Sequence, residues 1–153
     1  MHGNNGRAVQ VSSSNEVVLS ADARGASTFQ MVECLAMDIV SESQRPNCVS
    51  LMIDNQTHWY VRHYDRYLRV DSKYDTDNLP AFERDSSFIL HSDTFYPDHY
   101  ALESVNFPGW YVESQGDGRL MVVQRDNIAD YYDAASFRVY DVSTSSTYYP
   151  RSV

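Results

Sequence analysis

The sequence predicts a single all-β domain assembled from three repeats of about fifty residues. Three observations lead to this class. Short β-branched and aromatic runs recur along the chain, turn residues separate them, and the order of the runs repeats itself. A chain of 153 residues suits one domain and is long enough to bury a core without a metal or many disulfides. Many short strands at this spacing are typical of a barrel or a sandwich.

Strand signals occur at six places, at residues 59–62, 67–70, 88–90, 110–112, 120–123 and 137–140. Turn dipeptides punctuate these runs: Asp65-Arg66, Pro108-Gly109 and Asp117-Gly118. Helix signals are scarce. Residues 29–40 place apolar side chains at helical spacing, but the pattern is short and lacks a good cap at its end, so we predict a strand followed by a loop.

The repeats account for nearly the whole chain. A tryptophan-led run, a leucine-containing run and a phenylalanine-led run occur in the same order in residues 48–98 and 99–145, and a fainter copy occupies residues 7–47. Each copy has too few strands to bury its own apolar face, so packing three together closes the sheet. The first copy lacks a clear opening strand, and we expect its closure to be imperfect or to use the C-terminal tail. Residues 1–6 and 146–153 are expected to be flexible ends.

The charge of the chain limits its partners. The net charge is −9, from 12 basic and 21 acidic residues, and this acidity argues against nucleic acid and anionic membranes as partners. No run of 18 apolar residues predicts insertion into a membrane. The first residues do not resemble a signal peptide. We expect an extracellular or secreted module of a longer protein, whose targeting signal lies outside this sequence.

The two cysteines, Cys34 and Cys48, leave two interpretations open. They are too few for a zinc site without nearby histidines, and the sequence contains no CxxC motif. They either form one disulfide that closes a short loop or remain two buried thiols. A disulfide would require their Cα atoms to lie within about 7 Å.

Three short motifs carry a resemblance to a known family. The segment ESVNFPGWYV at residues 103–112 resembles a signature of the C-terminal module of arabinofuranosidase B, the family 42 carbohydrate-binding module. The segment YVRH at residues 60–63 resembles the Tyr-x-Arg-His of that family, and DSSF at residues 85–88 resembles its Asp-Ala-Ser/Thr-Phe. The resemblance covers residues 48–141 well and residues 7–32 weakly.

The resemblance implies a β-trefoil with one potential sugar pocket per repeat, and a lectin-like module without catalytic activity of its own. In that family the ligand is an arabinofuranose side group of a plant polysaccharide. By motif match, His63 and Asp85 would grip its hydroxyls, which both donate and accept hydrogen bonds. Tyr64, next to His63, is the stacking candidate, and Arg62 would support the site. A single shallow pocket implies millimolar to high-micromolar binding, about −4 to −6 kcal/mol.

The outer repeats depart from the family pattern. Ser114 stands where the third repeat would carry its histidine, and Ala134 stands where it would carry its aspartate. Asp133 is one position away, and a shift of one residue in a strand reverses the direction of a side chain. The first repeat has Val11 and Ala26 at the two places. We therefore expect one competent pocket, in the second repeat.

Other readings of the sequence compete with sugar binding. The missing residues of the outer repeats motivate a second hypothesis, a structural or protein-binding trefoil that has lost its sugar sites. Asp71 and the run at residues 75–78 suggest calcium but lack the order of an EF-hand, so we expect a solvated loop without a metal. No HExxH, GxSxG or P-loop pattern occurs, and we expect neither catalysis nor a cofactor. The recurring aromatic residues are expected to pack in the core: Trp59, Phe88, Trp110 and Phe137.

Overall fold

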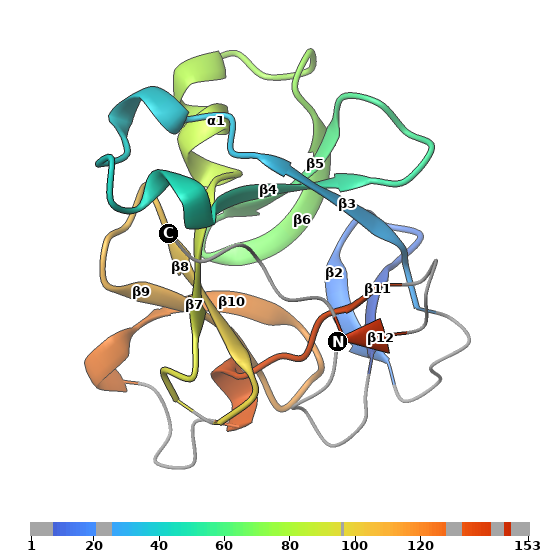
Figure 1. Ribbon diagram of the computed structural model, residues 1–153. Helices are drawn as coiled ribbons and strands as arrows, with labels where there is room; N and C mark the ends of the chain where they lie inside the picture. The colour runs from blue at the N-terminus through green and yellow to red at the C-terminus, as the bar shows by residue number, and fades with distance from the viewer. Residues whose placement is uncertain (1–7, 21–25, 96, 128–132, 142–145, 148–153) are drawn as a thin grey trace.

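The structure of the chain is a computed structural model that describes residues 8–20, 26–95, 97–127, 133–141 and 146–147 (Figure 1). These residues form antiparallel strands, one short α-helix and several single-turn 3-10 helices. This confirms the predicted all-β class. No helix within the described residues is long and apolar enough to cross a membrane.

The strands follow the sequence repeats. The first repeat contributes β1 (Ala8–Val11), β2 (Val17–Ser20) and β3 (Phe29–Glu33). The second contributes β4 (Cys48–Ile53), β5 (Trp59–Tyr64), β6 (Tyr67–Ser72) and β7 (Phe88–Ser92). The third contributes β8 (Tyr100–Ser104), β9 (Trp110–Ser114), β10 (Leu120–Gln124) and β11 (Tyr140–Asp141), and it is followed by β12 (Ser146–Thr147).

Each repeat contains one hairpin, and the three hairpins are β1–β2, β5–β6 and β9–β10. Strands β3 to β10 form one sheet in the order β3-β4-β5-β6-β10-β9-β8-β7, and an additional β4–β7 pairing joins strands within the second repeat. A two-stranded hairpin alone is marginally stable in water. The hairpins therefore depend on contacts with one another.

Main-chain hydrogen bonds join the three hairpins in a cycle. The N–H of Val70 donates to the carbonyl of Asn15, and the N–H of Val122 donates to the carbonyl of Arg66, both at 2.8 Å. The N–H of Leu19 completes the cycle by donating to the carbonyl of Gly118 at 2.7 Å. The three acceptors are turn residues with positive φ: Asn15 at 63°, Arg66 at 73° and Gly118 at 89°. Donors and acceptors recur about every fifty residues, which confirms the threefold β-trefoil.

The C-terminal part of the chain contributes to the closure of the third repeat. Strand β11 pairs with β12 as β3 pairs with β4 and β7 with β8, so β12 gives β11 the partner that β4 and β8 give to β3 and β7. Ser146 and Thr147 were expected to belong to a flexible end and instead form this strand. The other expected flexible residues, 1–6 and 148–153, lie outside the described part of the chain.

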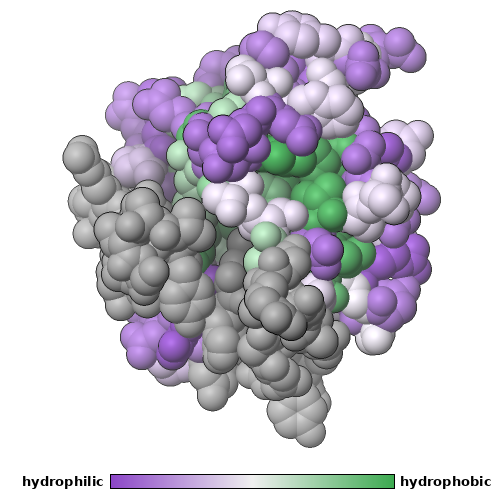
Figure 2. All heavy atoms as spheres, turned by 90° about the vertical axis from the view of Figure 1, so that its right-hand side faces the viewer, coloured by the Kyte–Doolittle hydropathy of each residue, from purple (hydrophilic) through white to green (hydrophobic). Residues whose placement is uncertain are grey.

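The core is built from side chains that point inward from all three repeats. Phe88 and Phe137 are each 1% exposed, and Trp59 and Trp110 are half-buried against the same cluster, as predicted. Seen from the right-hand side of Figure 1, hydrophobic residues are visible mainly in a recess between hydrophilic ones (Figure 2).

The structure adds one helix that the sequence did not predict. Helix α1 (Leu79–Asp85) lies against β5 (Figure 1). Pro80 stands in its first turn, and the side chain of Asn78 caps it by accepting a hydrogen bond from the N–H of Ala81 at 3.1 Å. Phe82 is the buried residue of the helix. The helix ends at Asp85, and because the helix packs on β5, Asp85 lies beside that strand.

The two cysteines form a disulfide, which settles the open question. The Cα atoms of Cys34 and Cys48 are 5.3 Å apart, and both residues are buried. The bond fastens the end of β3 to the start of β4 across a segment that contains the 3-10 helices Met37–Ile39 and Arg45–Asn47. Residues 29–40 thus form a strand, followed by an irregular segment with a single 3-10 turn.

Candidate functional site

Asp85 is the centre of a partly buried hydrogen-bond network at the end of α1. Its side chain is 14% exposed. Nη2 of Arg62 donates to one carboxylate oxygen at 3.0 Å, and Nδ2 of Asn106 donates to the other at 2.6 Å. Charge-assisted hydrogen bonds of this kind are about twice as strong as neutral ones. The carboxylate is therefore held rigidly by a cation from the second repeat and an amide from the third.

His63 lies next to this carboxylate but is buried, with 3% of its side chain exposed. Its Nε2 is 2.9 Å from Oγ of Ser104 and 3.7 Å from Oδ1 of Asp85, so the hydrogen bond is made with the serine. Burial lowers the pKa of His63 below its ordinary value of 6.5; the charge of Asp85 opposes this effect and that of Arg62 reinforces it. The lowered pKa favours the neutral imidazole at pH 7.

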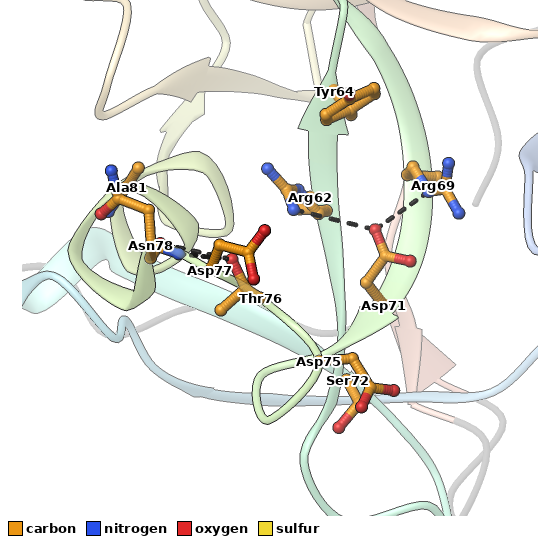
Figure 3. A pocket seen from close by; sticks show the side chains of 10 residues that line it. All are labelled: Arg62, Tyr64, Arg69, Asp71, Ser72, Asp75, Thr76, Asp77, Asn78 and Ala81. Carbon is orange, nitrogen blue, oxygen red and sulfur yellow. Dashed lines mark hydrogen bonds and ion pairs between the residues drawn. The ribbon is translucent and has the colours of Figure 1, made fainter.

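An open, polar hollow of about 410 Å³ lies on the other side of Arg62 (Figure 3). Nη1 of Arg62 lies 3.8 Å from a carboxylate oxygen of Asp71, and Nε of Arg69 lies 2.9 Å from the same oxygen. The hollow is lined by charged and hydroxyl-bearing side chains, one aromatic ring and the start of α1: Arg62, Tyr64, Arg69, Asp71, Ser72, Asp75, Thr76, Asp77, Asn78 and Ala81. Such a lining offers both donors and acceptors to a polyhydroxylated ligand.

Tyr64 is the aromatic ring of the hollow. It is 60% exposed, and the guanidinium groups of Arg62 and Arg69 lie 5.3 Å and 5.9 Å from its ring centroid. Cations at this distance are attracted to an aromatic ring. Tyr64 therefore offers an exposed aromatic ring, flanked by two arginines, at the hollow.

The four residues singled out from the sequence thus lie in one region but play different parts. Arg62 and Tyr64 line the hollow, whereas His63 and Asp85 lie behind Arg62 and do not line it. Arg62 joins the two groups because its guanidinium contacts both Asp85 and Asp71. Nε2 of His63 lies 3.7 Å from Oδ1 of Asp85, the two residues that the motif match had grouped in one pocket.

Sequence reasoning missed three residues of the third repeat. Ser104 bonds to His63, Asn106 bonds to Asp85, and the ring of Phe107 lies 4.9 Å from that of His63. All three belong to the segment ESVNFPGWYV, residues 103–112, that carried the family resemblance. That segment was the signal that could have found them, but nothing in its spacing shows that it contacts the preceding repeat.

The hairpin registers identify the counterparts of His63. His63 pairs with Leu68, Val11 pairs with Val17, and Ser114 pairs with Leu120. Val11 and Ser114 therefore occupy the equivalent positions in the outer repeats, as the sequence comparison between repeats indicated. The side chain of Asp133 lies outside the described side chains. The described residues thus place a histidine beside an aspartate in the second repeat.

The acidic residues suggested for calcium lie at the hollow. Asp71 is paired with arginine, and Asp75 and Asp77 line the rim. Within the part of the chain that the structure describes, no group of three or more histidine, cysteine, aspartate or glutamate side chains could hold a metal ion.

The sequence matches the family model of the alpha-L-arabinofuranosidase B (ABFB) domain over residues 1–139. A comparison with curated proteins gives no significant match.

Similar solved structures include an arabinofuranosidase complexed with arabinofuranosyl-alpha-1,2-xylobiose, at 15% identity and a TM-score of 0.59. The similarity covers 86% of this chain and 30% of that chain, so this chain spans less than a third of the enzyme's length. The cytokine interleukin-36alpha is also similar, at 18% identity and a TM-score of 0.56, over 87% of this chain and 85% of its own. At these identities the likenesses establish the fold alone, and they agree with the β-trefoil.

Proposed function

The chain belongs to the alpha-L-arabinofuranosidase B domain family, and from that premise we propose that its second repeat binds arabinofuranose-type side groups of polysaccharides. The observation that carries the proposal is the network at Asp85. His63, Asp85 and Arg62, which the family motifs select, converge there beside a polar hollow.

The two parts of the region have complementary roles in this proposal. Asp85 keeps 14% of its side chain exposed, and a fixed carboxylate is a strong acceptor for sugar hydroxyls. The adjoining hollow, with Tyr64 at its side, accommodates the sugar to which the side group is attached. His63 lies 3.7 Å from Asp85 and is held by Ser104, and Arg62 contributes to both parts.

A comparison of ligands tests the proposal. We expect nuclear magnetic resonance titration to show binding of arabinofuranosyl-xylobiose, because the furanose ring supplies hydroxyls to Asp85. Xylobiose without the side group is the matched control and should bind at least about tenfold more weakly, the cost of losing one charged hydrogen bond. Equal affinity for the two ligands would contradict recognition of the side group.

Absence of binding to any arabinose-containing glycan would instead favour the structural or protein-binding trefoil. That second hypothesis gains its motivation from Val11 and Ser114, which cannot replace the imidazole of His63. In either case we propose a non-catalytic module that forms part of a longer secreted protein. A carbohydrate module of this kind increases the local concentration of whatever domain is linked to it.

A further inference from the structure

We propose that Glu103 is a positioning residue for the second-repeat site, which it serves from the third repeat. Glu103 holds the turn at residues 105–109, and that turn presents Asn106 to Asp85 and Phe107 to His63. The inference rests on the proposed function for its effect on sugar binding, but the contacts that carry it are independent of any ligand.

The carboxylate of Glu103 is 15% exposed and is satisfied on both oxygens. Nε2 of His91 lies 2.7 Å from Oε1, and the main-chain N–H of Gly109 donates to Oε2 at 2.8 Å. The hydrogen bond with His91, aided by that from Gly109 and opposed by burial, lowers the pKa of Glu103 below 4.5. Glu103 is therefore a fixed anion that ties strands β7 and β8 to the far end of the turn.

The near end of the turn is held as well. Oγ of Ser104 accepts a hydrogen bond from the N–H of Phe107 at 3.0 Å, and the N–H of Val105 donates to the carbonyl of Ser87 at 3.0 Å. Gly109 has a φ of 87°, which lets the chain reverse before β9 begins. The turn is thus fixed at both ends, and Glu103 holds its second end by accepting the hydrogen bond from the N–H of Gly109.

The turn carries the two contacts that complete the site from the third repeat. The amide of Asn106 reaches Asp85 at 2.6 Å, and the ring of Phe107, 38% exposed, lies over His63. Glu103 itself neither lines the hollow nor contacts Asp85. A change at Glu103 should therefore reach the site through Asn106 and Phe107.

The test combines two substitutions with a matched control. Glu103→Gln keeps the length of the side chain and one acceptor oxygen but loses the charge. We expect it to shift the Asn106 side-chain amide and Phe107 main-chain resonances and to weaken binding of arabinofuranosyl-xylobiose about three- to tenfold, a change the size of one ordinary hydrogen bond, because the effect reaches the site only through the turn. Glu113→Gln is the control, since Glu113 accepts from Gln115 at 3.1 Å on the separate strand β9 and should change neither.

A double-mutant cycle separates positioning from general destabilisation. In the background of Asn106→Ala and Phe107→Ala, Glu103→Gln should cause no further loss of affinity, because the groups through which it acts are gone. An equal loss in both backgrounds, or unchanged resonances of the turn, would overturn the proposal. If the resonances move but the unmutated protein binds no arabinoside, the positioning role stands and the proposed function fails.

Discussion

The main-chain N–H of Val70 donates a hydrogen bond to the carbonyl oxygen of Asn15, a turn residue of a different repeat, at 2.8 Å. The same bond recurs at the other two junctions between hairpins, with Gly118 as the acceptor at one of them. Because each acceptor has a positive φ, the geometry of each turn is linked to the docking of the next hairpin. The cycle therefore makes the three turns sensitive to residues that cannot adopt this conformation.

Gly118→Ala should lower the free energy of unfolding by about 1–2 kcal/mol, the cost of left-handed backbone for an L-residue. Its φ is 89°, and an added Cβ would lie 3.3 Å from the carbonyl oxygen of Leu19. Gly116→Ala is the matched control, because nothing lies within 4 Å of its added Cβ. Urea denaturation measures both, and equal effects would contradict a special role for Gly118.

Asp85→Ala should weaken arabinoside binding by about 1.5–3 kcal/mol, the contribution of a hydrogen bond to a charged group. Gln115→Ala, in the third repeat, should leave the affinity unchanged because Gln115 bonds to Glu113 within its own hairpin. Titration calorimetry compares the two variants, and thermal unfolding checks that Asp85→Ala remains folded. A comparable loss in Gln115→Ala would mean that the site lies in another repeat.

Tyr64→Ala should weaken binding by about 0.5–1.5 kcal/mol if the ring stacks on the ligand. Tyr74 provides the control: it is 70% exposed, compared with 60% for Tyr64, but does not line the hollow. Tyr74→Ala should therefore bind like the unmutated protein in the same titration. The stacking role is wrong if both variants lose the same affinity.

His63 should make the stability of the protein depend on pH. The pKa of His63 is lower in the folded protein than in the unfolded chain, where it is about 6.5. As the pH falls below that value, the unfolded chain takes up the proton first, and this uptake favours unfolding. The contribution of neutral His63 is complete above that value and is lost progressively as the pH falls towards the lower, folded pKa. Melting temperatures from pH 7.5 to 5 should fall less steeply in His63→Gln than in the unmutated protein. Parallel curves would contradict this.

Replacing both cysteines by serine, Cys34→Ser with Cys48→Ser, should lower the free energy of unfolding by about 3 kcal/mol, the value expected for a closed loop of about 15 residues. A reducing agent should destabilise the unmutated protein similarly and leave the double variant unchanged. Guanidinium denaturation with and without reductant measures this. Insensitivity of the unmutated protein to reductant would argue against the disulfide.

The fold was predictable because its hydrophobic pattern repeats. Core residues such as Phe88 and Phe137 occupy equivalent positions in their repeats. This apolar pattern can be recognised even where the polar residues of the repeats differ. Helix α1 escaped prediction because it buries only Phe82, so it has no apolar stripe to recognise. Its local signals are an N-cap and a proline, which also occur in loops.

The site was predictable only in part. The family resemblance, and not the spacing of the motifs, grouped His63 with Asp85, and it gave no information on depth: His63 is 3% exposed. The contribution of Asn106 could not be predicted because it crosses the junction between repeats. The cysteine pairing likewise needed the Cα separation of 5.3 Å, which sequence separation does not determine.

The hydrogen bond between Asp85 and Asn106 joins the second and third repeats, so separating these two repeats breaks it. A ligand that engages this junction binds only while the two repeats remain docked, so it acts as a reversible clamp between them. At ten times its dissociation constant, such a ligand would add about 1.4 kcal/mol to the free energy of separating the repeats. Under mechanical load, bound protein would therefore resist opening at this junction more than free protein does.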